Sequence, residues 1–176
     1  MALIQRPPNP TRSEPQSLTL AAIRNGAGGV RDTLDVMVAL AKSYRTNLEI
    51  RNLAESLVRD IPQKDYWSEA EAIQRYVRDR IRYTQDTYDM EMLKTPLELL
   101  ASRQGDCDDK SLLAATLLLS IGHPARFKAI GYAPGEYEHV YTETKIGDEW
   151  VSVETTEPVE LGWIPRQPSS VMVRHI

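Results

Sequence analysis

One segment of the sequence limits the possible folds more than any other. Between Asp106 and Gly122, a short acidic stretch runs into an almost wholly apolar one, in a chain whose residues are 26% charged. Asp106 is a favoured helix N-cap, and Gly122 suits the end of a helix. The apolar side chains between them cover nearly every side of a helix, so we predict that this helix lies at the centre of the core. They are Leu112, Leu113, Ala114, Ala115, Leu117, Leu118, Leu119 and Ile121.

The preceding part of the chain, from Arg31 to Arg103, repeats apolar residues at the three- and four-residue spacing of helices. Proline and capping signals divide this part into four helices. The predicted helices run over Leu34–Tyr44, from Asn47 to Pro62, from a Ser68-x-x-Glu71 capping box through Ile81, and from a cap at Thr95 that Pro96 and Glu98 follow.

After Gly122 the spacing of apolar residues changes to two, which is typical of strands. We predict strands over residues 125–132, 137–146 and 149–156. Gly147-Asp148 separates the last two strands as a two-residue loop, of the kind that makes a type II′ hairpin. Helices therefore come first and antiparallel strands second. This order predicts an α+β fold in which a helical N-terminal half packs on an antiparallel sheet.

Prolines and glycines divide the chain further. Residues 1–30 are predicted to form an extended arm, because Pro and Gly at this density do not build a core. A single domain then covers residues 31–176. We expect it to be helical over 31–122 and β-rich over 123–164, with a tail over 165–176.

Composition argues against several classes of protein. The net charge of −4 and the lack of a Lys/Arg block argue against a nucleic-acid binder. A single cysteine rules out an internal disulfide framework and a multi-thiolate zinc site. The longest apolar stretch, residues 112–121, is shorter than the ~20 residues that span a bilayer, and prolines stand where a signal peptide has its apolar region. We therefore expect a cytoplasmic protein that binds no membrane.

The single cysteine, Cys107, takes the first helical position if Asp106 is the N-cap. Backbone N–H groups and the positive dipole end at a helix start stabilise a thiolate, and they can also hold the oxyanion of a tetrahedral intermediate. Nearby carboxylates act in the opposite direction and raise the pKa of a thiol. We expect Asp106 and Asp109 to cap the helix and Asp108 to point away from it.

A thiol nucleophile needs an imidazole, and His139 is the candidate. His123 lies at the far end of a helix about 20 Å long, and His175 lies next to the C-terminal residue. In the predicted hairpin, His139 and Glu154 share one sheet face as diagonal neighbours, about 7–8 Å apart at the backbone. Glu154 is then placed to accept the imidazole N–H and to fix its tautomer.

Simpler interpretations of the same residues remain open. A lone cysteine is most often an inert, small apolar residue. A strand histidine is usually structural, and a glutamate on an edge strand is usually solvated. The acidic residues around Cys107 suggest a cation such as calcium, although the spacing of the calcium-binding D-x-D-x-D-G loop is not there.

Taken in order, these motifs resemble the transglutaminase-like superfamily of papain-type thiol enzymes. The similar segments are "GDCDDKSLLAATLLLSIGHPARF", "EHVYTET" and "EWVSVETTEP", and the resemblance extends from Ser68 to Trp163. Glu154 departs from the pattern, since the family usually has Asp there. The GDCDD variant with a helical N-terminal part is similar to small proteins of bacteria and of their phages or prophages, which implies association with the host cytoplasm or a phage particle.

The resemblance implies a catalytic triad of Cys107, His139 and Glu154 and acyl transfer at amide bonds. The implied partner is a protein or peptide substrate, and no cofactor or metal is implied. The alternatives are a catalytically weak or inactive interaction and assembly module, and an ion-binding structural domain. Further candidates for the oxyanion site or the cleft are Gln104, Asp106, Asp108, Trp67 and Tyr83.

Overall fold

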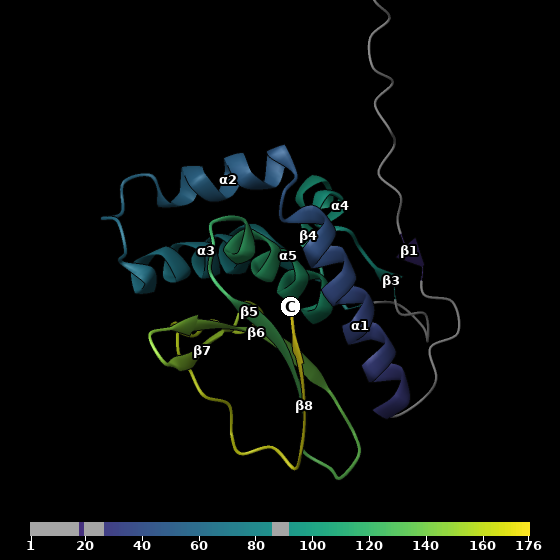
Figure 1. Cartoon of the computed structure of the whole chain (residues 1–176). Helices are drawn as coiled ribbons and strands as arrows, with labels where there is room; N and C mark the ends of the chain where they lie inside the picture. Colours follow the sequence, from purple (N-terminus) through teal and green to yellow (C-terminus); the bar gives the residue numbers. More distant parts are fainter. Residues whose placement is uncertain (1–17, 20–26, 86–91) are drawn as a thin grey trace, which may run out of the picture.

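The computed structural model describes residues 18–19, 27–85 and 92–176 of the chain. In these ranges an antiparallel sheet carries the helices on one side, and α5 (Cys107–Ser120) lies between the sheet and the other helices (Figure 1). The remaining helices are α1 (Ala27–Tyr44), α2 (Leu48–Val58), α3 (Tyr66–Arg80) and α4 (Pro96–Ser102). The strands are β1 (Leu18–Thr19), β2 (Arg82–Tyr83), β3 (Met92–Leu93), β4 (Gln104–Gly105), β5 (Ala125–Gly131), β6 (His139–Ile146), β7 (Glu149–Val153) and β8 (Ser170–His175).

The central helix is confirmed. α5 contacts α1, α2, α3 and α4 as well as strands β5 and β6. Its leucines at positions 112, 113, 117 and 118 are fully buried. Such all-round burial requires the apolar surface on every side of the helix that the sequence supplies. Among the described residues, no helix combines the length and apolar character that a membrane crossing requires.

The predicted ends of α5 are confirmed by their hydrogen bonds. Oδ1 of Asp106 accepts from the backbone N–H groups of Asp108 and Asp109, each at 3.1 Å. At the other end, Gly122 has a φ of 93°, and its N–H donates to Leu119 O while that of His123 donates to Leu118 O. This pair of bonds is a Schellman motif, which favours glycine because of its left-handed backbone.

The starts of two other helices differ from the prediction. α1 begins at Ala27, so residues 27–30 of the predicted arm are helical, while residues 1–17 and 20–26 lie outside the described part of the chain. α3 is capped by Asp65 and not by Ser68. Asp65 accepts hydrogen bonds from both the N–H and the hydroxyl of Ser68, so Ser68 lies inside the first turn and is itself a donor to the cap. The cap of α4 is as predicted, with a reciprocal Thr95–Glu98 capping box.

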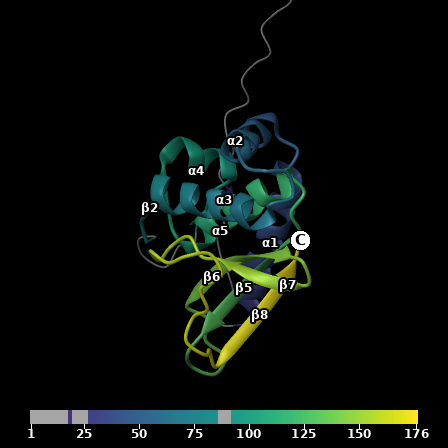
Figure 2. The same cartoon turned by 90° about the vertical axis from the view of Figure 1, so that its left-hand side faces the viewer.

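The main sheet has the strand order β7-β6-β5-β8, with antiparallel neighbours throughout (Figure 2). The register of the β6–β7 hairpin is as predicted, because Ile146 pairs with Glu149 and Thr142 pairs with Val153. Gly147 has a φ of 61°, as the first central residue of a type II′ turn requires. Thr142 of β6 faces α5, because its hydroxyl donates to Ser111 O. β7 ends at Val153, so it is shorter than the strand predicted over residues 149–156, and Glu154 follows it.

The C-terminal residues correct the predicted tail over 165–176. Residues 170–175 form β8, which pairs with β5 along its whole length, from Arg126 opposite His175 to Gly131 opposite Ser170. Without β8, β5 would present a row of unpaired backbone groups at the edge of the sheet. The sequence also gave no indication of the two-residue strand pairs β1–β3 and β2–β4.

The central position of α5 makes its leucines the most costly to truncate. We expect Leu117→Ala, at a fully buried position, to lower the free energy of unfolding by about 2–5 kcal/mol, since it loses apolar burial and leaves a cavity. The matched control is Leu48→Ala, at a side chain that is 72% exposed, for which the change should stay within about 0.5 kcal/mol. Urea denaturation measures both. Equal effects of the two substitutions would contradict the placement of α5.

Candidate active site

The start of α5 opens into a cavity of about 400 Å³. Cys107, the first residue of α5, is half-buried and lines this cavity together with His139 from the start of β6. Asp106, Asp108 and Tyr83 also line it. The thiol and the imidazole that the sequence paired by elimination therefore meet in one cavity.

Two buried hydrogen bonds fix α5 against β6. The hydroxyl of Ser111 donates to Val140 O at 3.1 Å, and the hydroxyl of Thr142 donates to Ser111 O at 2.8 Å. Ser111 lies one turn beyond Cys107, and Val140 follows His139 in β6. These bonds therefore set the position of the thiol relative to the imidazole.

The hairpin brings His139 and Glu154 into contact. Nε2 of His139 lies 2.6 Å from Oε2 of Glu154, a side chain that is only 1% exposed. The other carboxylate oxygen, Oε1, accepts the backbone N–H groups of Thr156 at 2.6 Å and Glu157 at 3.3 Å. The ring of Tyr141 stacks on His139 with centroids 6.0 Å apart. The imidazole is thus held at one nitrogen and on one face, which leaves Nδ1 for another partner.

These contacts decide the ionisation of Glu154. Burial by itself raises the pKa of a carboxyl group, because it penalises the charged form. The hydrogen bond to His139, the charge of that imidazole and the N–H groups of Thr156 and Glu157 outweigh burial, so the pKa of Glu154 lies below its ordinary value. Glu154 is therefore an anion at neutral pH, able to orient and stabilise an imidazolium.

The environment of Cys107 has the opposite effect. Burial raises the pKa of the thiol well above its ordinary value, and the charges of Asp108 and Asp106 raise it further, against a lowering effect from the backbone of Val140. The thiol donates a hydrogen bond to Oδ1 of Asp108 at 3.4 Å. The expected stabilisation of the thiolate by the helix start is not realised, because Asp106 already accepts the N–H groups of Asp108 and Asp109.

One prediction about the aspartates is wrong. Asp109 does not cap α5 but lies buried at its side, where it accepts from the backbone N–H of Lys94 at 2.7 Å and from its Nζ at 2.8 Å. Gly105 allows this arrangement, since a Cβ there would lie 2.6 Å from Oδ2 of Asp109. Asp108 is half-buried, lines the cavity and contacts the thiol.

The remaining candidates divide into two groups. Tyr83 lines the cavity, as Asp106 and Asp108 do. Gln104 is exposed, and its Oε1 accepts from Arg82 at 2.7 Å. Trp67 is 46% exposed at the start of α3, with its ring beside Gly162. Neither Gln104 nor Trp67 is among the residues that line the cavity.

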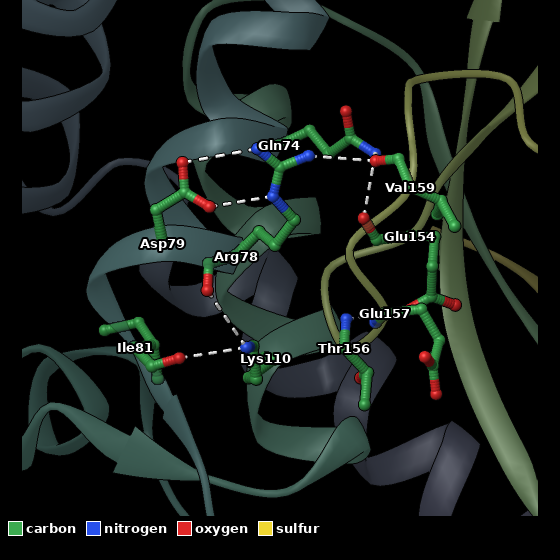
Figure 3. Close-up of polar contacts among 9 residues, drawn as sticks. All are labelled: Gln74, Arg78, Asp79, Ile81, Lys110, Glu154, Thr156, Glu157 and Val159. Carbon is green, nitrogen blue, oxygen red and sulfur yellow. Dashed lines mark hydrogen bonds and ion pairs between the residues drawn. The ribbon is translucent and has the colours of Figure 1, made fainter.

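The sequence analysis missed a group of polar residues behind Glu154 (Figure 3). Gln74 and Lys110 are almost completely buried, and Nζ of Lys110 donates to Ile81 O at 2.9 Å. One signal for Lys110 was present in the sequence. A lysine near the start of a helix opposes the helix dipole, which indicates that its ammonium group has a specific partner. No comparable signal distinguished Gln74 from the other polar residues of α3.

A metal site receives no support from the described ranges, where no three His, Cys, Asp or Glu side chains gather as a set of metal ligands. The carboxylates nearest the thiol have other roles. Asp106 caps α5, and Asp108 accepts from the thiol.

A family model of the transglutaminase-like superfamily matches residues 51–155, which include Cys107, His139 and Glu154. This chain belongs to the transglutaminase-like superfamily. The match begins within α2 and ends just after β7, so it includes the central helix and the hairpin. No match to a curated protein was found.

Two solved structures share the fold of this transglutaminase-like protein. A protein of Cytophaga hutchinsonii described as a putative cysteine protease is 16% identical, with a TM-score of 0.54 over 84% of this chain. One of Parabacteroides distasonis described as a putative protease is 12% identical, with a TM-score of 0.57 over 81% of this chain. The chain spans 57% and 29% of the length of these two proteins. The likeness shows an α+β fold.

The contact between Cys107 and Asp108 can be tested by removing one charge. We expect Asp108→Asn to lower the pKa of Cys107 and to raise its rate of alkylation by iodoacetamide several-fold at pH 7.5, because a carboxylate beside a thiol opposes its ionisation. Mass spectrometry of the alkylated protein measures the rate. Asp148→Asn removes the same charge from an exposed turn and should leave the rate unchanged. A rate unaffected by Asp108→Asn would contradict the electrostatic description of the site.

The lowered pKa of Glu154 predicts a pH dependence of stability. An ionised Glu154 contributes stability above its ordinary pKa of 4.5, and this contribution is lost as the pH falls through the lower folded-state pKa. We expect Glu154→Gln to reduce the free energy of unfolding by about 1–3 kcal/mol at pH 7 and by progressively less below pH 4.5. Denaturant titrations across this range measure the difference. If the difference in the free energy of unfolding between the two proteins stays constant with pH, these contacts do not lower the pKa of Glu154.

Proposed function

We propose that this protein is a thiol-dependent acyl-transfer enzyme that acts on amide bonds of a protein or peptide. Cys107 is the nucleophile, His139 the general base and acid, and Glu154 the residue that orients His139. The observation that carries the proposal is the 2.6 Å contact between His139 and a buried, ionised Glu154 at the cavity that Cys107 lines.

The first half of the reaction forms an acyl-enzyme. Because Nε2 of His139 is held by Glu154, Nδ1 is the nitrogen that takes the proton from Sγ of Cys107. The thiolate then attacks the carbonyl carbon of the amide. His139 returns the proton to the leaving amine, the C–N bond breaks, and a thioester of Cys107 remains.

The oxyanion of the tetrahedral intermediate needs N–H donors. The side chain of Asp106 accepts the N–H groups of Asp108 and Asp109, and its backbone oxygen accepts that of Lys110. Among the N–H groups of the first turn of α5, that of Cys107 is the one from which Asp106 does not accept a hydrogen bond. We assign this group to the oxyanion, and Tyr83 in the cavity wall is the remaining candidate from the sequence for a second donor.

The second half of the reaction consumes the thioester. His139 removes a proton from water, hydroxide attacks the thioester carbonyl, and a carboxylic acid and the free thiol of Cys107 result. An amine in place of water would form a new amide. We propose hydrolysis, because it requires no second binding site. Neither route requires a cofactor.

One observation favours a second function, that of an inactive interaction and assembly module. The pKa of Cys107 is raised well above its ordinary value, and the thiol donates to Asp108 and not to His139. A thiol that stays protonated is a poor nucleophile unless the imidazole takes its proton. The two functions therefore differ in whether His139 controls the reactivity of Cys107.

A screen of peptide and amide substrates, followed by chromatography of the products, tests the proposal. We expect Cys107→Ala to abolish turnover and His139→Ala to reduce it by about 10²–10⁴-fold, the usual contribution of a general base. His123→Ala is the matched histidine control, since His123 pairs with Glu69 at the opposite end of α5. If no substrate is turned over and His139→Ala leaves alkylation of Cys107 unchanged at every pH, the module function is supported instead.

A further inference from the structure

Glu154 lies at the start of a loop that α3 holds in place (Figure 3). The loop, residues 154–159, follows β7 and supplies the N–H groups of Thr156 and Glu157 to the carboxylate of Glu154 itself. The position of the carboxylate therefore depends on the conformation of this loop. No strand pairing among the described residues fixes the loop, since the ladder of the hairpin ends at Val153.

Gln74 joins the two ends of the loop. It is completely buried in α3, and its Nε2 donates to the carbonyl oxygens of Glu154 at 2.9 Å and Val159 at 3.3 Å. One side-chain amide thus closes a loop of six residues. Its Oε1 is buried without a hydrogen-bond partner among the described residues. The two hydrogen bonds of the side-chain amide therefore both go to the loop.

Two further residues complete this support. NH1 of Arg78, one turn beyond Gln74, donates to Val159 O at 2.9 Å, and Asp79 orients the guanidinium through two contacts of 2.8 and 3.3 Å. Nζ of Lys110, which extends from the helix of Cys107, donates to Ile81 O at 2.9 Å and to Arg78 O at 3.5 Å at the end of α3. Lys110 therefore ties the nucleophile helix to the helix that holds the Glu154 loop.

We propose that Gln74 is a positioning residue that closes the loop of residues 154–159 and thereby holds the carboxylate of Glu154 against His139, with Arg78 and Lys110 as its supports. The inference rests on the proposed function for its effect on Cys107. The effect on the carboxylate itself does not depend on catalysis. A purely structural role for Gln74 would lower stability without acting through Glu154, and the two roles are separable.

Hydrogen exchange of the Thr156 and Glu157 amides tests the positioning directly. Gln74→Met keeps the side-chain volume and removes both donors. We expect exchange at these two amides to accelerate by about tenfold, the factor that one lost hydrogen bond supplies. The matched control is Glu69→Gln, which removes the charge from the contact of α3 with His123 and should leave both amides protected. Unchanged exchange in Gln74→Met would overturn the proposal.

A double-mutant cycle tests the consequence for Cys107. We expect Gln74→Met to slow alkylation of Cys107 by iodoacetamide several-fold at pH 7.5, and to have no further effect in a Glu154→Gln background. An effect that persists unchanged in that background would overturn the proposal, because Gln74 would not then act through Glu154. If Gln74→Met does not fold, Arg78→Met replaces it, since it removes the other donor to Val159 from a side chain that is 20% exposed.

The two measurements also separate this proposal from the proposed function. Faster exchange at Thr156 and Glu157, with alkylation unaffected by both Gln74→Met and Glu154→Gln, would support the positioning role of Gln74 and overturn the triad. Slower alkylation in Glu154→Gln, with unchanged exchange in Gln74→Met, would support the triad and overturn the role of Gln74.

Discussion

The joint between α5 and β6 is the constraint on which the rest of the site depends. Across it, the hydroxyl of Ser111 donates to Val140 O of β6, and the hydroxyl of Thr142 donates to Ser111 O of α5. Buried polar groups of this kind tolerate little displacement, because an unmade bond costs the full desolvation of both partners. The joint therefore fixes Cys107 relative to His139 more rigidly than apolar packing would, and it leaves the leucines of α5 to fill the core around it.

The two ends of the proposed triad, Glu154 and Cys107, lie in opposite electrostatic environments. Glu154 is surrounded by N–H donors and stays ionised, whereas Cys107 is half-buried beside carboxylates that raise the pKa of its thiol. Asp106 contributes to the environment of Cys107 in a second way, because it accepts the N–H groups of the first turn of α5 that could otherwise stabilise a thiolate. Under the proposed function, activation of the thiol would depend on His139, and hence on how firmly the loop behind Glu154 is held.

Much of the fold could be predicted because it follows from spacing along the chain. The all-round apolar surface of α5 implied burial, and the two-residue loop at Gly147 fixed the register of the β6–β7 hairpin. The predictions that failed depend on which of several possible partners a residue meets. Asp65 caps α3 in place of Ser68, and residues 170–175 pair with β5 instead of forming a tail. The spacing of residues along the chain does not show which of two nearby residues will cap a helix. Nor does it show that one edge of β5 is free to pair with another strand.

For the candidate site, the sequence by itself determined the residue types and their order. It placed a cysteine at a helix start, a histidine in a strand and a carboxylate at the end of the return segment, because each position follows from local periodicity and turn length. The structure puts that carboxylate, Glu154, just after β7. Only the tertiary structure decided where Asp109, Asp108 and Lys110 point. Packing brings their surroundings near: Lys94 for Asp109, the cavity for Asp108 and the end of α3 for Lys110. Side chains of one helix turn project in different directions, and no local pattern specifies what each of them meets.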